Sequence, residues 1–220
     1  MRDNRASLEY HLQELAIARS PGDARRALPD IGEKDSRVLD VGCGIGQTLL
    51  ALGVSAGSEA HGVDIDETAI AFGNAHYPEL RLRTGAGEAL PYGDKYFDLV
   101  ICRVSLPYMH IPTALREFSR VLVPRGRLWL VLHPLSMLRT DLAHAWTDRS
   151  VRSLLYRGYA LTNTLALAVN RQYRYPLNRA RIESYQPALL MRRALRRTGF
   201  LEVRTWTDNG QSFATAFRES

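Results

Sequence analysis

Apolar positions along the chain fall into short strand-like runs that alternate with segments of helical spacing. Val38, Leu39 and Val41 form an apolar run of the kind expected for a strand buried on both faces. Residues 80–83 alternate leucine with arginine, as a half-buried strand does. The expected strands comprise residues 38–41, 61–64, 80–83, 99–104, 128–132, 200–206 and 212–218. Because helical segments separate most of these runs, the pattern predicts an α/β chain with a mostly parallel sheet.

Helical spacing recurs between the strands. Ser7 can cap a helix that reaches Arg19, and Pro112 opens an amphipathic helix at its first turn. The expected helices comprise residues 7–19, 48–52, 66–70, 112–122 and 187–198, and residues 149–169 form one or two more. Asn209-Gly210 separates the last two strands and indicates a β-hairpin, so one of these strands should run antiparallel to the rest of the sheet.

Glycines stand at alternate positions after the first strand, in the pattern Asp40-x-Gly42-x-Gly44-x-Gly46. The dinucleotide pattern G-x-G-x-x-G fails here, because Gln47 occupies its sixth place. Missing side chains let the backbone turn sharply and approach a ligand closely, and N–H groups at the following helix start add donors. Strand, glycine turn and helix indicate a nucleotide-like cofactor at the carboxyl end of the sheet, although a glycine turn without a ligand has the same local pattern.

An acid at the end of the second expected strand supports the cofactor interpretation. Asp64 lies 18 residues after Gly46, where a Rossmann-like sheet places a carboxylate that accepts hydrogen bonds from ribose hydroxyls. Asp66 is a suitable N-cap for the helix that follows, and Glu67 suits its first turn. The alternative for Asp64 is an ordinary solvated acid at a strand end.

These motifs resemble the cofactor loop of class I S-adenosylmethionine-dependent methyltransferases of the Rossmann-like, type 11 group. The phrase VLDVGCGIG carries the resemblance, and the segments Glu88-Ala89-Leu90-Pro91-Tyr92 and Phe97-Asp98-Leu99-Val100 extend it. The resemblance implies a doubly wound, seven-stranded, mostly parallel sheet of order 3-2-1-4-5-7-6, whose last strand is antiparallel. It also implies S-adenosylmethionine as cofactor and a helical lid inserted between the fifth and sixth strands.

The resemblance further implies which residues bind the cofactor. These are Asp40, Gly42, Cys43, Gly44, Asp64, Ile65, Ala86, Gly87, Glu88 and Arg103. The chain departs from the family at Ala86, where an aspartate commonly contacts the adenine amino group, and Gly87 can still offer a backbone N–H. One lost hydrogen bond of this kind costs roughly 0.5–1.5 kcal/mol. Arg125 replaces a glycine of the family's Pro-Gly-Gly turn, so that turn must accommodate a side chain.

Tyr108 and His110, in the segment SLPYMH, are the candidate catalytic residues at the mouth of the expected site. A histidine there can act as a general base near neutral pH, or it can have a structural or substrate-orienting role. His133 is a further candidate, and Tyr10 and His11 of the first helix are candidate lid contacts. The six histidines show no metal-ligand spacing with cysteine or carboxylate, so no metal site is expected.

Composition bounds the organisation of the chain. Its 220 residues and 45% hydrophobic content predict one globular domain with a sizeable core. The resemblance implies that this is a single methyltransferase domain over residues 1–220, with a helical cap at 1–35 and a basic helical lid at 133–187. Two cysteines make no disulfide framework. Neither a secretory leader nor an apolar run of membrane-spanning length is evident, so we expect a cytoplasmic enzyme.

Charge is concentrated in the expected lid. The whole chain carries +6, and residues 134–182 alone contain eight arginines against two aspartates. Arginine and tyrosine in a lid favour a small acceptor with a carboxylate, a phosphate or an aromatic ring. We therefore expect a small-molecule methyltransferase that acts by direct in-line transfer. The acceptor atom, the use of a general base and the oligomeric state stay open.

Three other functions fit parts of the pattern. A nucleic-acid methyltransferase would track phosphates with residues 139–181, although the moderate charge and the lack of an RNA-binding module argue against it. A non-catalytic cofactor-binding partner protein would account for Ala86 and Arg125, whereas the glycine loop and Asp64 favour an active enzyme. The same basic helical region could attach peripherally to an anionic membrane.

Overall fold

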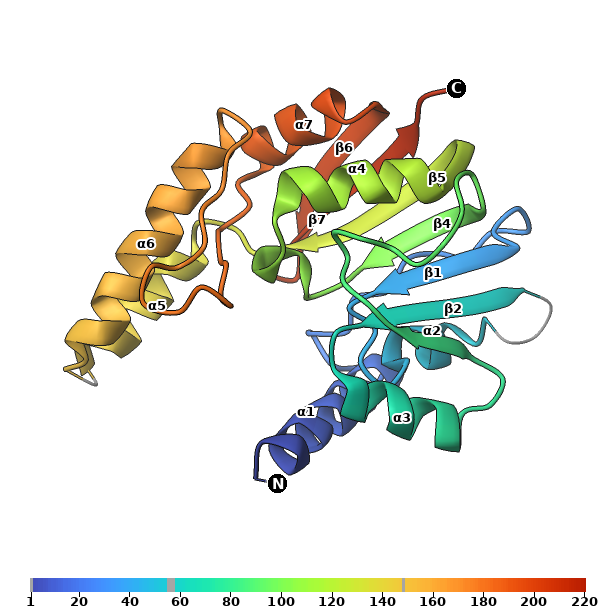
Figure 1. The fold of residues 1–220 in the computed structure, drawn as a ribbon, viewed down its shortest axis with the longest axis horizontal. Coiled ribbons are helices and arrows are strands. Elements are labelled where there is room, and N and C mark those ends of the chain that lie inside the picture. The colour runs from blue at the N-terminus through green and yellow to red at the C-terminus, as the bar shows by residue number, and fades with distance from the viewer. Residues whose placement is uncertain (1, 55–57, 148) are drawn as a thin grey trace.

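The computed structural model describes residues 2–54, 58–147 and 149–220 (Figure 1). Seven strands form one sheet in the order β3-β2-β1-β4-β5-β7-β6. They comprise β1 (Arg37–Val41), β2 (Glu59–Asp64), β3 (Arg81–Thr84), β4 (Phe97–Cys102), β5 (Leu122–Leu132), β6 (Phe200–Asp208) and β7 (Gln211–Arg218). β7 pairs antiparallel with β5 and with β6, whereas the other four strand pairings are parallel. The expected strand order and the antiparallel last strand are therefore confirmed.

Helices pack on both faces of the sheet. They comprise α1 (Arg2–Arg19), α2 (Gln47–Leu52), α3 (Glu67–His76), the 3₁₀ turn η1 (Leu106–Tyr108), α4 (Ile111–Val121), α5 (Met137–Thr147), α6 (Val151–Leu167) and α7 (Ala188–Arg197). Alternate residues of β4 enter opposite cores: Val100 packs with the α4 and α7 side, and Leu99 and Ile101 with the α2 and α3 side. The apolar runs of the central strands thus follow from burial on both faces.

The local turn chemistry is as the sequence predicts. Asp66 caps α3 by accepting hydrogen bonds from the N–H groups of Thr68 and Ala69. Asn209 and Gly210 both have positive φ, as a two-residue hairpin turn of the type I′ class requires. Gly199 ends α7 with φ +83°.

The start of β5 differs from the prediction. The strand was expected at residues 128–132, but it begins at Leu122 and includes the segment expected as a turn. The pairing with β4 jumps there, from Phe97 opposite Leu122 to Leu99 opposite Arg127. Arg125 takes the left-handed φ of +64° within this irregularity, and its guanidinium lies 2.7 Å from Glu202. A bulge therefore accommodates the side chain that replaces the family's glycine.

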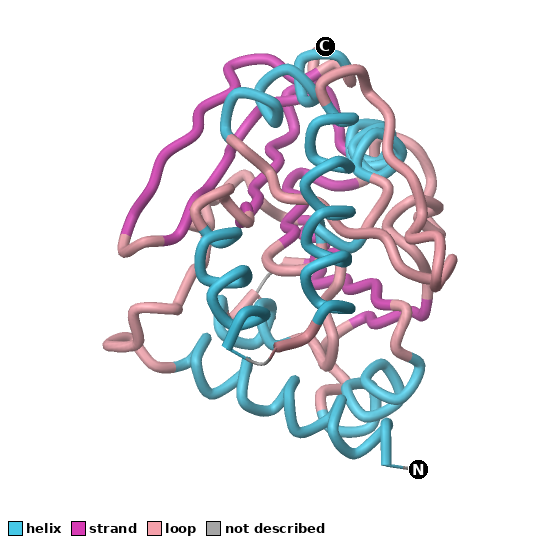
Figure 2. The backbone as a smooth tube through the Cα atoms, turned by 90° about the vertical axis from the view of Figure 1, so that its left-hand side faces the viewer, coloured by secondary structure: helices cyan, strands magenta, loops and turns pink. Residues whose placement is uncertain are grey.

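α5 and α6 form a helical hairpin that projects beside the sheet, and in Figure 2 the pair stands in front of the strands. Residues 149–169 yield one helix, α6, and α5 precedes it. The segment that connects α6 to α7 is fixed by two buried side-chain amides. Gln172 Oε1 accepts the N–H of Ile111 at 2.6 Å, and Gln186 Oε1 accepts the N–H of His133 at 2.9 Å.

None of the helices in the described ranges combines the length and apolar content needed to cross a lipid bilayer.

Candidate functional site

The glycine loop between β1 and α2 passes through left-handed backbone conformations at its three glycines. φ is +77° at Gly42, +53° at Gly44 and +91° at Gly46, a region that other residues rarely occupy. A Cβ atom on Gly42 would lie 1.9 Å from Ser105 Oγ, and one on Gly44 would lie 2.3 Å from His11 Nδ1. Glycine is therefore required at Gly42 and Gly44 for two reasons: the backbone conformation and the lack of space for a side chain.

The first N–H groups of this loop point to protein acceptors. Those of Gly42 and Cys43 donate to the carbonyl oxygen of Val63, with N–O distances of 2.7 and 3.1 Å. That of Gly44 donates to Asp64 Oδ2 at 2.7 Å. The loop thus offers a ligand close backbone approach, while donors have to come from the start of α2.

Asp64 stands beside the glycine loop at the carboxyl end of β2. Its Oδ2 accepts the Gly44 N–H, and its Oδ1 accepts the N–H of Asp66 at 2.9 Å. Two hydrogen bonds hold the carboxylate in place and leave lone pairs for further donors. Ile65 follows with 76% of its surface exposed. The residues assigned to ribose and adenine therefore lie together, preorganised at the edge of the sheet.

Asp40 is a buried carboxylate beneath the glycine loop. It is 1% exposed, and neither of its oxygens has a hydrogen-bond partner among the described residues. Burial raises the pKa of Asp40 to about 7. The positive charge of Arg103 opposes this shift, and so does the nearby Thr48 hydroxyl, although it does not reach hydrogen-bonding geometry with either oxygen. An unpartnered buried acceptor of this kind fits a ligand that brings a cationic or N–H group into the loop.

Asp40→Asn is expected to raise the free energy of unfolding of the ligand-free protein at alkaline pH. Folding raises the pKa of Asp40 from 3.8 to about 7. The protonated form is therefore favoured in the folded state, and wild-type stability falls as the pH rises from 4 through 7. The full loss is roughly 4 kcal/mol. Denaturant unfolding at pH 4 and pH 8 should show similar stability at pH 4 and a more stable variant at pH 8.

Glu67→Gln provides the control for that measurement, because Glu67 is exposed in the first turn of α3. It should change stability little at either pH. A difference between Asp40→Asn and wild type that is equal at pH 4 and pH 8 would contradict the assigned titration.

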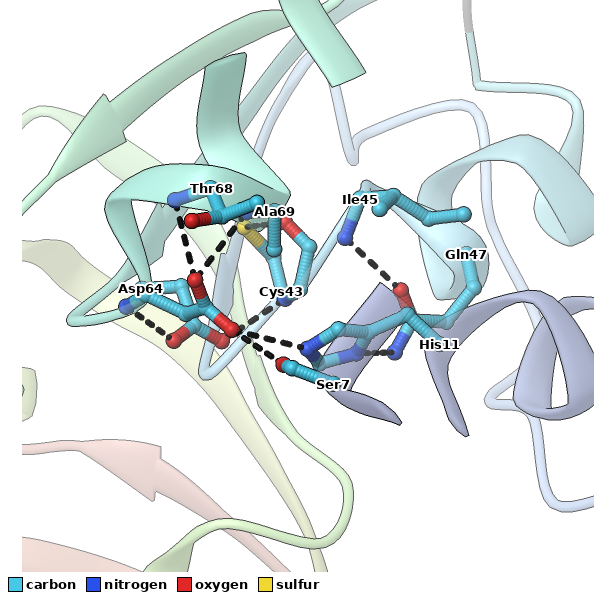
Figure 3. A network of polar contacts seen from close by, with 10 residues as sticks. Ser7, His11, Cys43, Ile45, Gln47, Asp64, Thr68 and Ala69 are labelled. Atoms are coloured by element: carbon cyan, nitrogen blue, oxygen red, sulfur yellow. Dashed lines mark hydrogen bonds and ion pairs between the residues drawn. The ribbon is translucent and has the colours of Figure 1, made fainter. Parts of the chain in front are cut away.

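α1 covers the glycine loop through polar contacts (Figure 3). Ser7 Oγ donates to Asp66 Oδ2, and His11 Nε2 lies 3.7 Å from the same oxygen. His11 Nδ1 lies 3.4 Å from Gln47 Nε2 at the start of α2. Ile45, in the loop itself, donates its N–H to Gln47 Oε1 at 3.1 Å. The first helix is therefore bound both to Asp66, the N-cap of α3, and to Gln47 at the start of α2.

A buried ion pair extends this attachment to β4. Arg103 Nη2 lies 2.6 Å from Glu14 Oε2, with 6% and 18% of the two side chains exposed. The prediction that Ser7 caps the first helix is wrong, because α1 begins at Arg2 and the Ser7 hydroxyl lies within the helix, bonded to Asp66. Neither Glu14 nor Gln47 was predicted to lie in the site. Ser7 and Glu14 have a signal that could have placed them there, because with His11 they stand at i, i+4 and i+7, on one face of a helix.

Two cavities open at the carboxyl edge of the sheet. The smaller, of about 160 Å³, is lined by Gly42 and Asp64 of the core, by Tyr10 and Glu14 of α1, and by Tyr108. Ligand cavities commonly measure roughly 300–1,000 Å³. A cofactor-sized ligand therefore requires α1 to shift or requires part of the ligand to extend into the neighbouring space.

The larger cavity, of about 550 Å³, separates the core from the lid. Ile65 and Tyr108 line it on the core side, and Arg152, Tyr156 and Arg181 line it on the lid side. Tyr108 belongs to both cavities, so the two spaces meet at its side chain.

The arginines of the lid differ in their partners. Arg157 Nη1 lies 3.3 Å from Asp141 Oδ2 and 2.9 Å from Glu183 Oε1, so its charge is neutralised inside the lid. Among the described residues, neither Arg152 nor Arg181 has an ion-pair partner. The larger cavity therefore has two positive charges available for an anionic ligand.

Comparison with known proteins identifies this arrangement. Residues 39–130 match the family described as a methyltransferase domain. This part of the chain is therefore similar to class I S-adenosylmethionine-dependent methyltransferase domains. The Bacillus subtilis uncharacterized methyltransferase YcgJ is 34% identical over 105 residues, covering 45% of this chain and 41% of that protein. A Staphylococcus aureus demethylmenaquinone methyltransferase is 34% identical over 111 residues, covering 46% and 45%.

Solved structures share the fold of this chain over nearly its whole length. A chain from the complex between the Haloferax volcanii Trm112 methyltransferase activator and a methyltransferase has a TM-score of 0.67 and 16% identity, covering 99% of this chain and 97% of its own. Human N-acetylserotonin methyltransferase has a TM-score of 0.63 and 14% identity, covering 100% and 57%. The chain spans less than half the length of the curated relatives described above.

The candidate acid–base residues of the chain lie in different places. Tyr108 lines both cavities, whereas His110 lines neither. His110 Nδ1 lies 2.8 Å from Thr113 Oγ1 at the start of α4, and its backbone N–H donates to Glu88 Oε1. The His133 ring packs edge to face on Tyr108, and burial lowers the pKa of both histidines. The geometry therefore favours Tyr108 over His110 as a substrate contact.

Arg103, also assigned to the cofactor, lines the smaller cavity. The remaining assigned residues line neither cavity and belong to its supporting structure. Cys43 is fully buried, and burial raises the pKa of its thiol well above the ordinary value, so it is no nucleophile. A Cβ atom on Gly87 would lie 2.6 Å from Met109 Sδ, which explains the glycine there. Ala86 and Glu88 flank it, and the Glu88 carboxylate is engaged by the start of α4. Their cofactor contacts stay predictions.

Proposed function

We propose that this methyltransferase transfers a methyl group from S-adenosylmethionine to a small acceptor that is anionic, aromatic or both. The observation that carries the proposal is the meeting of two cavities at Tyr108. One is floored by the glycine loop and Asp64, and the other is lined by arginine and tyrosine of the lid. Donor and acceptor held in adjoining spaces are in the arrangement that direct transfer requires.

The residues around the smaller cavity fit the proposed cofactor. Asp64 can accept hydrogen bonds from ribose hydroxyls, and the exposed Ile65 can pack on adenine. The unpartnered Asp40 carboxylate suits the amino group of the methionine part. S-adenosylmethionine supplies an already activated sulfonium methyl group, so the protein chiefly has to position the acceptor and exclude water.

The larger cavity supports an aromatic anion as acceptor. Arg152 and Arg181 can bind a carboxylate or phosphate, and Tyr108 and Tyr156 can offer ring faces. Arg181 already lies 5.9 Å from the centroid of the Tyr156 ring, so charge and aromatic surface are adjacent. The Staphylococcus aureus relative, named a demethylmenaquinone methyltransferase, is consistent with a small-molecule acceptor.

Tyr108 serves this reaction as a positioning group and hydrogen-bond donor. Burial, followed by the negative charge of Glu183, raises the pKa of Tyr108 above its ordinary value. The hydroxyl therefore stays protonated at neutral pH and does not supply a base. An acceptor that must lose a proton therefore has to lose it to a group other than Tyr108.

Thermal unfolding with S-adenosylmethionine, S-adenosylhomocysteine and NAD tests the cofactor. A ligand at a hundredfold its dissociation constant stabilises by about 2.7 kcal/mol. For a chain of this size that is a shift of roughly 5–11 °C in Tm. We expect the shift with both sulfur compounds and none with NAD. No shift with either sulfur compound would contradict the proposal.

Transfer of a labelled methyl group to paired acceptors tests the substrate class. Aromatic carboxylates and phosphates should be methylated in preference to their neutral analogues, and Arg152→Gln with Arg181→Gln should raise KM for the anions only. Preferential methylation of RNA, with a steep salt dependence, would instead support the nucleic-acid hypothesis.

A further inference from the structure

The outer face of α6 carries a stripe of uncharged side chains that the described structure leaves uncovered. Val151, Leu155, Leu165 and Val169 are 69%, 61%, 64% and 68% exposed. Their spacing places them on one side of the helix, and the other exposed positions on that side are a glycine and a threonine. Arg152 is exposed as well, but it lies off this side and lines the larger cavity. The stripe therefore runs the length of α6 without a charge.

The last turn of α5 adds an exposed tryptophan to this stripe, and the connection to α6 adds an arginine. Trp146 is 76% exposed, and a hollow of about 340 Å³ lies between it, Arg149, Val151 and Leu154. Tryptophan rings favour the boundary between water and lipid, because one part of the ring is apolar and its N–H is polar. An arginine beside such a ring can pair with a phosphate.

The charge of this region distinguishes two possible partners of the exposed face, a second copy of the chain and a lipid surface. Residues 134–182 carry +6, and in the described part of the chain Arg157 is the only one of their eight arginines in an ion pair. A second copy docked face to face would bring like charges together. An anionic lipid surface complements both the positive charge and the apolar stripe.

We propose that the outer face of the α5–α6 hairpin docks on an anionic lipid bilayer. The α6 stripe and Trp146 enter the boundary between headgroups and acyl chains, and Arg149 meets the headgroup phosphates. Docking places α6 against lipid while the larger cavity, on the inner side of the same helix, stays open to the core. This inference rests on the lid surface and stands independently of the proposed acceptor.

Co-sedimentation of the full chain with vesicles tests the proposal. We expect binding to phosphatidylcholine vesicles that contain phosphatidylglycerol, little binding to phosphatidylcholine alone, and weaker binding at high salt. Leu155→Ser should weaken the partition coefficient about tenfold. Arg149→Gln should weaken it about fivefold.

Two exposed residues of α7 provide matched control variants for the vesicle-binding measurement. Leu189 is 62% exposed, and Arg193 is exposed as well, so Leu189→Ser and Arg193→Gln remove similar groups from another surface. Both should retain wild-type binding. Control variants that lose as much as the lid variants would overturn the proposal, as would no binding to anionic vesicles.

Sedimentation velocity without lipid tests whether a second copy of the chain, instead of a membrane, covers this face. A dimer that Leu155→Ser dissociates, in a protein that does not bind vesicles, would assign the face to a second copy and overturn the membrane proposal. Because the measured quantity is lipid binding, a failure here is separate from a failure to bind S-adenosylmethionine.

Discussion

Methyl transfer by a Tyr108→Ala variant is expected to fall about 100-fold in kcat/KM, because misplacing the acceptor by an ångström can cost that much. Tyr108 is the side chain at which the two cavities meet, and its ring also packs on His133. Its removal joins the two spaces and frees the acceptor to move. Binding of S-adenosylhomocysteine should change much less than transfer, and calorimetry with steady-state kinetics measures the two separately.

Tyr108→Phe separates the ring from the hydroxyl. Because the raised pKa keeps the hydroxyl protonated, its loss should cost one hydrogen bond, or up to about tenfold in rate. The pH dependence of transfer should keep its shape in this variant. Near wild-type transfer by Tyr108→Ala together with a large loss in His110→Gln would reverse the assignment of the two residues.

Asp64→Ala is expected to weaken S-adenosylmethionine and S-adenosylhomocysteine by about 100-fold, since hydrogen bonds to a charged group contribute about 1.5–3 kcal/mol each. The carboxylate is held toward the site by the N–H groups of Gly44 and Asp66. At a ligand concentration that shifts the wild-type Tm, the variant should show almost no shift. Isothermal titration measures the affinity directly.

Glu67→Ala is the matched control for Asp64→Ala, because it removes an exposed acid three residues away on α3. It should bind both sulfur compounds as the wild type does. Asp64→Ala will also leave two N–H groups without their acceptor, so its ligand-free Tm should fall. Retention of the full ligand-induced shift in Asp64→Ala would place the ribose elsewhere.

Much of the framework follows from the sequence because it depends on local patterns. Buried strands require apolar runs, the glycine loop requires left-handed φ at Gly42 and Gly44, and the N-cap requires a short acceptor side chain such as that of Asp66. The family resemblance supplied the strand order and the lid position, which pattern alone left open. Local preference also explains the main error, because Pro124 and Gly126 indicate a turn where the sheet forms a bulge instead.

The site itself depends on contacts between distant parts of the chain. The pairing of Glu14 with Arg103 brings together residues 89 positions apart, and nothing local to either predicts it. The same holds for the choice between Tyr108 and His110, which are neighbours in sequence but face different surroundings.

The sequence by itself therefore determined an α/β framework with a glycine loop, an acid at the end of the second strand and a basic helical segment, and the family resemblance supplied their expected roles. Only the tertiary structure decided that Asp40 is buried without a partner and that Arg157 is neutralised while Arg152 stays available. The physical reason is that hydrogen-bond satisfaction, desolvation and ion pairing are properties of a residue's surroundings. Those surroundings exist only once the chain has folded.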